Sequence, residues 1–230
     1  MTGKAKILYV YKVDHDLGIN PNPFGEYCTL AYCKGGMRGS IHKYIVQQQE
    51  NCPALKVRDM GIWVIGIAGS GLGKERWGKL LYAMQVTEVL TFEEYWADSR
   101  FEYKKRVLNE QESREIKNGG KWNYAFFRKN KNRLVCGDNI PGVEDKGYKY
   151  ILISKIFIYH GEECRKQDEI FICRFEKDVN DSMRPYRIFS TDRGNPIPEG
   201  VTLYLQNEFE NKKCLSRPTF STDGFEYKEY

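Results

Sequence analysis

The segment Tyr148–His160, with the sequence YKYILISKIFIYH, is the most apolar run in the chain and sets the strictest limit on its fold. Its β-branched and aromatic residues favour strands. A run of this kind predicts either a pair of central strands or one long bent strand. Ala5–Val13 has a similar composition and predicts the first strand of the chain.

The segment Gly61–Lys79, GIWVIGIAGSGLGKERWGK, is rich in glycine. Gly61–Ala68 predicts a strand and Lys79–Val89 predicts its partner, so the glycines between them indicate a mobile hairpin loop. A P-loop is excluded because a carboxylate, Glu75, stands where that motif needs a hydroxyl to hold Mg²⁺. The dinucleotide pattern G-x-G-x-x-G also fails, because its last glycine is missing and no helix-forming run follows.

Four segments carry helical signals. Thr91-Phe-Glu-Glu94 fits a capping box, in which the Thr hydroxyl and the Glu carboxylate satisfy free backbone donors, so a short helix should continue through Trp96. The other expected helices are Met37–Gln49, Arg100–Lys117 and Val201–Phe209. Residues 121–149 predict irregular structure.

Strands broken by single helices, without regular alternation of strand and helix, predict the α+β class. We expect a mostly antiparallel, barrel-like sheet with peripheral helices. One domain should cover residues 1–214, followed by a C-terminal tail over residues 215–230.

Composition limits the classes of function. The chain has 36 Lys and Arg against 31 Asp and Glu, and its net charge of +5 permits a polyanionic partner without requiring one. Aromatic residues form 14% of the chain, and Tyr and Trp rings suit both a core and stacking on bases. The seven cysteines lack C-x₂-C pairs, which predicts reduced thiols in a cytoplasmic protein and no metal site. No run approaches the roughly 20 apolar residues that span a bilayer, so we expect no membrane contact.

Residues Gly18–Tyr27 include two prolines and two glycines, which predict a stiff, turn-rich loop. A rigid loop that displays Asn22, Phe24 and Tyr27 suits recognition of a flat heterocycle, and simple loop packing explains it equally well. Three aromatic residues from other elements complete this pocket in one interpretation and belong to the core in another. They are Trp63, Tyr82 and Trp96.

Carboxylates gather where the short helix is expected to begin, at Glu88, Glu93, Glu94 and Asp98. Two of them could form an acid–base pair, but a helix N-terminus also attracts acidic residues through its dipole. The turn at Asp138-Asn139 has two interpretations as well, since these side chains can hydrogen-bond their own backbone or a base edge.

Five segments form a characteristic set in order along the chain. They are PNPFGEYCTLAYCK (Pro21–Lys34), GIWVIGIAG (Gly61–Gly69), LLYAMQVTEVLTFEEYWADSRF (Leu80–Phe101), CGDNI (Cys136–Ile140) and YILISKIFIYHG (Tyr150–Gly161). Together they resemble the nucleotide modification associated domain 2 family, from Ile7 to about Phe209. The resemblance implies a role in bacterial or phage systems that modify or handle altered nucleic-acid bases, and it implies no particular reaction.

Two further comparisons qualify this resemblance. The family usually carries Gly-Asp before its tryptophan-bearing strand, and Gly61-Ile62 replaces that pair here. The strand–hairpin–strand unit and its short helix are also similar to the small barrels of the PUA, ASCH and EVE group, which grip an extruded or modified base.

The residues and the resemblance together predict a nucleotide- or base-recognition module whose partners are a nucleotide or nucleic acid and the proteins of a base-modification system. The predicted base-binding residues are Asn22, Phe24, Tyr27, Trp63, Tyr82, Trp96, Asp98, Arg100, Asp138 and Asn139. The predicted phosphate-binding residues are Lys74, Arg76, Lys79, Arg128 and Lys131, with Lys129 and Arg133 beside them. Two alternatives stay open: an enzyme that uses Cys28 or Asp98 on a nucleotide or modified base, and a subunit that acts only through partners. The pattern implies no known cofactor.

Overall fold

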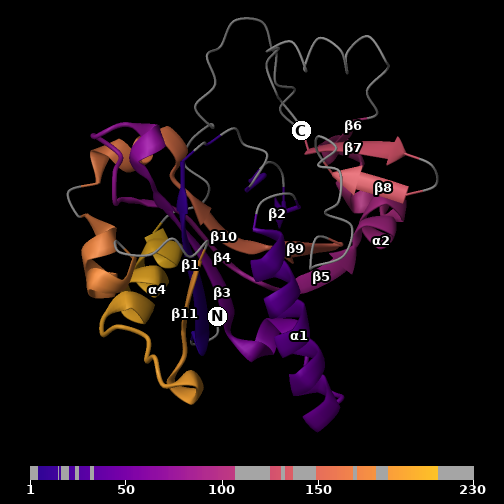
Figure 1. Cartoon of the computed structure of the whole chain (residues 1–230), viewed down its shortest axis with the longest axis horizontal. Helices are drawn as coiled ribbons and strands as arrows, with labels where there is room; N and C mark the ends of the chain where they lie inside the picture. Colours follow the sequence, from indigo (N-terminus) through magenta and orange to yellow (C-terminus); the bar gives the residue numbers. More distant parts are fainter. Residues whose placement is uncertain are drawn as a thin grey trace, which may run out of the picture.

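The computed structural model in Figure 1 describes residues 5–14, 16, 21–23, 26–31, 34–106, 125–130, 133–136, 149–167, 170–179 and 186–211. Its largest element is a five-stranded sheet with the strand order β10-β4-β3-β1-β11. These strands are β1 (Ile7–Val13), β3 (Ile62–Ala68), β4 (Leu80–Gln85), β10 (Ile156–Tyr159) and β11 (Arg187–Phe189). β1 and β3 run parallel, and the other neighbouring pairs are antiparallel.

Helical elements cover both faces of this sheet, with α1 (Gly35–Asn51) on one side and α4 (Val201–Asn211) on the other (Figure 1). Tyr9 and Tyr11 of β1 pack in the same cluster as residues of α1, whereas Leu8 packs with α4 and with the 3-10 helix η5 (Phe171–Val179). All seven residues of β3 are buried. A strand that is covered on both faces is apolar throughout, which explains the continuous apolar run of β3.

A second, antiparallel sheet has the order β2-β9-β5. Its strands are β2 (Cys28–Leu30), β5 (Glu88–Thr91) and β9 (Tyr150–Ser154). α1 packs against it, because the ring of His42 stacks on the ring of Tyr150 at 3.7 Å and the buried Arg38 guanidinium donates a hydrogen bond to the Tyr150 carbonyl. A third small sheet contains β6 (Lys105–Arg106), β7 (Ala125–Asn130) and β8 (Arg133–Cys136).

The α+β class is as expected, but the barrel-like, PUA- or EVE-like sheet is wrong. β10 and β11 are the two edges of the five-stranded sheet, and within the described residues no barrel closes. The reason is the parallel pairing of β1 with β3, in which Ile7 lies opposite Ile62. Parallel neighbours need a long crossover connection, and β2 and α1 lie within that crossover.

The apolar run at Tyr148–His160 forms two strands that belong to different sheets. β9 is the central strand of the second sheet and β10 is an edge of the first. Ser154 makes the change of direction, since its buried hydroxyl donates to the Ile156 carbonyl at 2.7 Å and accepts from the Ile156 amide at 2.9 Å. The sequence left a strand pair and a bent strand as alternatives, and the chain combines a sharp bend with two separate pairings.

Most of the predicted elements are confirmed. β1, β3 and helices α1, α4 and α2 (Phe92–Ala97) lie where the sequence places them. The expected partner strand Lys79–Val89 is confirmed in part, because β4 pairs with β3 but the segment from Glu88 begins β5 of the second sheet. Two predictions are wrong: the 3-10 helix η3 (Ser99–Lys104) and β6 occupy the start of the expected helix Arg100–Lys117, and β7 and β8 occupy part of the segment expected to be irregular. The rest of those segments and the expected tail lie outside the described residues.

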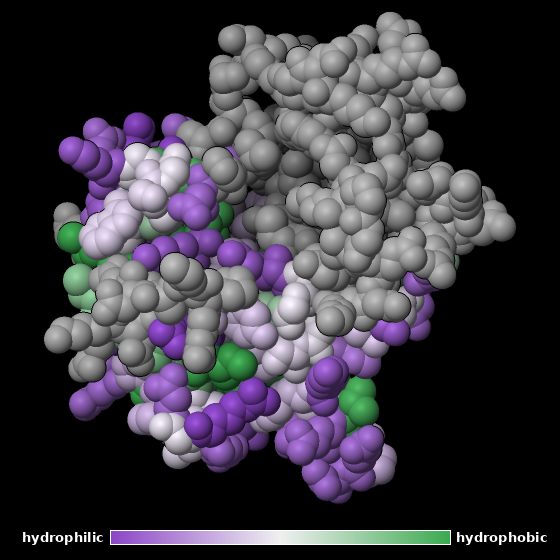
Figure 2. All heavy atoms as spheres, in the orientation of Figure 1, coloured by the Kyte–Doolittle hydropathy of each residue, from purple (hydrophilic) through white to green (hydrophobic). Residues whose placement is uncertain are grey.

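The coloured part of the face in Figure 2 is mostly hydrophilic, and its apolar side chains form separate small patches. Within the described residues, no helix has the length and hydropathy needed to cross a membrane.

Candidate functional site

The start of α2 positions the most elaborate group of exposed charges. The Thr91 hydroxyl accepts from the Glu94 amide at 3.2 Å, and the Glu94 carboxylate accepts from the Thr91 amide at 2.7 Å. This confirms the predicted capping box, and the hydrogen bonds from Thr91 lower the pKa of Glu94. The capping box fixes where α2 begins, and α2 ends at the C-cap residue Asp98, whose backbone amide donates to the carbonyls of Glu94 and Tyr95.

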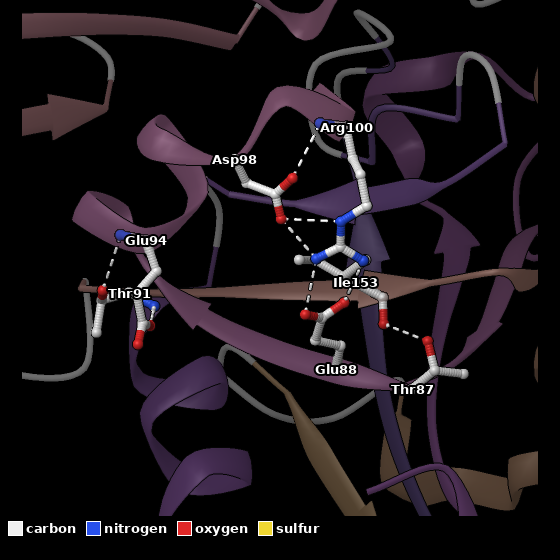
Figure 3. Close-up of polar contacts among 7 residues, drawn as sticks. All are labelled: Thr87, Glu88, Thr91, Glu94, Asp98, Arg100 and Ile153. Atoms are coloured by element: carbon white, nitrogen blue, oxygen red, sulfur yellow. Dashed lines mark hydrogen bonds and ion pairs between the residues drawn. The ribbon is translucent and has the colours of Figure 1, made fainter. Parts of the chain in front are cut away.

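Arg100 lies between two carboxylates (Figure 3). Its Nη1 and Nη2 atoms donate to the two carboxylate oxygens of Glu88 at 3.0 and 2.9 Å. Its Nε donates to Oδ2 of Asp98 at 2.8 Å, and its backbone amide donates to Oδ1 at 2.9 Å. The hydrogen bonds that its side chain donates to Glu88, and then those to Asp98, raise the pKa of Arg100. We call Glu88, Asp98, Arg100 and the neighbouring Tyr27 the Arg100 centre.

Aromatic rings lie against the Arg100 centre. The guanidinium carbon is 5.0 Å from the ring centroid of Phe101 and 5.5 Å from that of Tyr27. Lys155 lies between β9 and β10, and its Nζ is 4.7 Å from the Tyr27 ring centroid and 3.8 Å from a carboxylate oxygen of Glu26. The Arg100 side chain remains 39% exposed, so solvent reaches a guanidinium whose orientation is fixed by its neighbours.

The charges of this centre determine what it can attract. Two cations, Arg100 and Lys155, face three carboxylates, those of Glu26, Glu88 and Asp98. This balance gives a phosphate no electrostatic advantage. A neutral base suits it better, because carboxylates accept from the amino groups of bases and a guanidinium plane stacks on their rings.

The structure brings some of the predicted base-binding residues together. Tyr27, Asp98 and Arg100 form one group, whereas Asn22 is 2% exposed and pairs with Thr29 of β2. Trp96 lies in α2, close to this group along the chain. Phe24, Asp138 and Asn139 lie outside the described residues.

Trp63 and Tyr82 do not join this group. Trp63 is 2% exposed and packs edge-on against Phe209 of α4 at 5.1 Å. Tyr82 is fully buried, and its hydroxyl pairs with that of Tyr11 at 2.7 Å. Tyr27, Trp63 and Tyr82 therefore lie in three different core clusters, so these three rings do not line one common cavity.

Tyr82 belongs to a buried row of polar side chains that the sequence did not reveal. Tyr11, Gly66, Tyr82 and Tyr159 are neighbours across four adjacent strands. The Tyr159 hydroxyl donates to the buried carboxylate of Asp16, with oxygen–oxygen distances of 2.6 and 2.7 Å. In the sequence, the sign of this arrangement is that two aspartates, Asp14 and Asp16, follow the first strand. Acidic residues are also common in ordinary turns, so this sign is not specific.

Two of the three predicted phosphate-binding residues of the β3–β4 hairpin donate side-chain hydrogen bonds to backbone carbonyls. Lys74 is exposed, whereas Arg76 donates to the Leu72 carbonyl at 2.7 Å and Lys79 donates to the Arg165 carbonyl at 2.6 Å. Arg128 lies in β7, and Lys131 lies outside the described residues. We call the connection Gly69–Lys79 the hairpin loop.

The glycines of the hairpin loop serve close packing. A Cβ atom on Gly71 would lie 2.4 Å from the Asp14 carbonyl oxygen, and one on Gly69 would lie 2.2 Å from the Asp14 carboxylate. The loop therefore packs on the chain that follows β1, which answers why glycine recurs there without a phosphate motif.

The two residues that the sequence offers for catalysis, Cys28 and Asp98, are both held in structural contacts. Cys28 is fully buried in β2, and Asp98 is paired with Arg100. Burial raises the pKa of Cys164 to about 11, so that thiol is protonated at neutral pH. Among the described residues, no group of His, Cys, Asp and Glu side chains is placed to hold a metal ion.

The fold and its polar centres define an α+β protein with a sheet covered on both faces and a second sheet that carries the Arg100 centre. The chain belongs to the nucleotide modification associated domain 2 family, which matches residues 5–184. No curated protein and no solved structure matches the chain. Family membership associates the chain with nucleotide modification.

Proposed function

We propose that this chain recognises a nucleobase for a nucleotide-modification system, in which other components carry out the chemistry, and that the Arg100 centre contacts the base. The observation that supports this proposal is the partly exposed guanidinium of Arg100, held at its edges by Glu88 and Asp98. Three of the four residues of the Arg100 centre, Tyr27, Asp98 and Arg100, are among those that the sequence predicts to bind a base.

The geometry suits a flat ligand. Glu88 and Asp98 engage the N–H groups at the edges of the guanidinium, so a flat ligand would stack on the part of the plane that the rings of Tyr27 and Phe101 leave open. A fixed guanidinium loses little side-chain entropy when a ring stacks on it. Stacking of one base on a side chain contributes about 1–3 kcal/mol, which corresponds to a change in affinity of roughly 5- to 150-fold.

Exchange of Arg100 for lysine tests this proposal, because lysine keeps the positive charge and removes the plane. We expect Arg100→Lys and Arg100→Ala to weaken the binding of nucleosides and dinucleotides by similar factors, within roughly 5- to 150-fold, in calorimetric titration against ordinary and base-modified ligands. Thermal unfolding of each variant shows whether the fold persists.

Arg58→Ala is the matched control, because Arg58 is an exposed arginine that also faces a carboxylate, Asp59 at 3.7 Å. It should bind all ligands like the wild type. Equal affinity of wild type and a folded Arg100→Lys variant for every ligand would refute base stacking at this centre. A loss seen only with Arg100→Ala would indicate that charge, rather than the plane, is recognised.

A further inference from the structure

The Arg100 centre and the hairpin loop lie at opposite ends of β4. Lys79 precedes β4, and Glu88 follows it after a short connection. Figure 1 shows the hairpin loop at the upper left, on the opposite side of the molecule from β5 and α2. The six residues of β4 alone span about 20 Å, at roughly 3.3 Å per residue.

The hairpin loop has its own surface chemistry. Trp77 is 36% exposed, which makes it one of the few large apolar side chains at the surface of the described chain. Lys74 and Arg76 precede it in the chain, with the acidic Glu75 between these two cations. Figure 2 shows hydrophilic side chains at the upper left, where Figure 1 places this loop.

An exposed indole close to cations in the chain has the composition of a surface for single-stranded nucleic acid. Bases of any sequence stack on the ring, while lysine and arginine follow the phosphates. The Arg100 centre lacks such a cationic excess. Phosphate contact at the hairpin loop therefore complements base contact at the Arg100 centre, and no mononucleotide is long enough to reach both.

We infer that the ligand is a nucleic-acid strand rather than a free nucleotide, and that the hairpin loop binds it through Trp77, Lys74 and Arg76. This inference rests on the proposed function for the contact at the Arg100 centre. Stacked nucleotides advance about 3.4 Å each, so a strand needs roughly six nucleotides to cover the length of β4. Affinity should rise with length until that span is reached.

Fluorescence anisotropy with labelled oligothymidylate and oligouridylate, from a dinucleotide to about sixteen nucleotides, measures this dependence. For the wild type we expect weak binding of the dinucleotide and a gain of at least tenfold beyond roughly six nucleotides. Trp77→Ala and Lys74→Ala should remove much of that gain and leave dinucleotide binding unchanged. Lys74→Ala should also reduce the salt slope by about 0.7.

Two variants control for the loss of similar side chains elsewhere. Lys43→Ala removes an exposed cation from α1, and Leu203→Ala removes a 60% exposed apolar side chain from α4. Both should bind every length like the wild type.

The inference is overturned if long strands bind no better than the dinucleotide, or if Trp77→Ala and Lys74→Ala bind long strands like the wild type. Binding of an acidic protein by the hairpin loop, with no strand binding at any length, also overturns it. Failure of the proposed function looks different, because Arg100→Lys would then leave dinucleotide binding intact while the length dependence persists.

Discussion

Gly66 lies in the middle of the buried tyrosine row, and substitution by alanine should destabilise the protein strongly. A Cβ atom at this position would lie 2.2 and 2.4 Å from two ring carbons of Tyr82 and 3.0 Å from a methyl group of Val13. The Tyr82 ring is fully buried, and its hydroxyl is paired with Tyr11. The ring leans over the glycine, so the added methyl group must displace it.

Two costs follow from that displacement. Overpacking of a filled core costs about 1–3 kcal/mol. Separation of the Tyr11 and Tyr82 hydroxyls leaves buried polar groups with poorer partners, which costs about another 1–3 kcal/mol. We therefore expect Gly66→Ala to lower the free energy of unfolding by about 2–6 kcal/mol, a large part of the 5–15 kcal/mol typical of a domain.

A double-mutant cycle with Tyr82→Ala, followed by urea denaturation, isolates this clash. Once the ring is gone, Gly66→Ala should cost close to nothing, so the coupling free energy should equal most of the single-mutant cost. Gly36→Ala is the control, because a Cβ on Gly36 meets no atom within 4 Å and alanine favours the helix. Additive costs in the cycle, or a Gly66→Ala midpoint equal to that of the wild type, would refute the reasoning.

Three other predictions concern local structure. Thr91→Ala should lower the free energy of unfolding by about 1 kcal/mol through loss of the helix cap. Because hydrogen bonding lowers the pKa of Glu94 in the folded protein, the stability that this carboxylate contributes should be lost as pH falls below the ordinary pKa of a glutamate and through the lowered one. Denaturation between neutral and acidic pH measures both effects. Ser154→Ala should cost about 1–3 kcal/mol and speed hydrogen exchange at the Ile156 amide; unchanged exchange at that amide would contradict the assigned hydrogen bond. With iodoacetamide near neutral pH, the exposed Cys52 and Cys173 should be alkylated in the native protein while Cys28 and Cys164 are not, as read by peptide mass spectrometry. Early alkylation of Cys164 would contradict its buried environment. Because burial raises the pKa of Cys164 from 9.0 to about 11, the stability that this thiol contributes is complete below pH 9 and is lost as pH rises through about 11.

Local chemistry accounts for the elements that the sequence predicts correctly. The capping box at Thr91 and the helical spacing of Ile41 and Ile45 depend on residues three or four positions apart, and the structure contains both features. The parallel pairing of β1 with β3 depends on residues far apart in sequence. Strand composition does not encode direction, so an antiparallel barrel was the natural but wrong expectation.

The candidate site shows the same division. Asp98 and Arg100 are two residues apart, and the sequence predicts both as ligand contacts. Their partners come from distant segments, since Glu88 lies in β5 and Tyr27 precedes β2, and no motif in the sequence marks Phe101 or Lys155 as part of a site. Conversely, Trp63 and Tyr82 have the composition of a pocket wall and lie in the core, because an indole or phenol serves both purposes.

The pairing of β2 with β9, which lies far from it in the sequence, has a consequence for biosynthesis. Cys28 of β2 pairs with Ser154 of β9, so the second sheet cannot close until the ribosome has made more than half of the chain. At 5–20 residues per second, β2 waits roughly 6 to 25 seconds for its partner. During that interval a nascent chain exposes an unpaired apolar strand, and chaperone binding there would favour the correct product over aggregates.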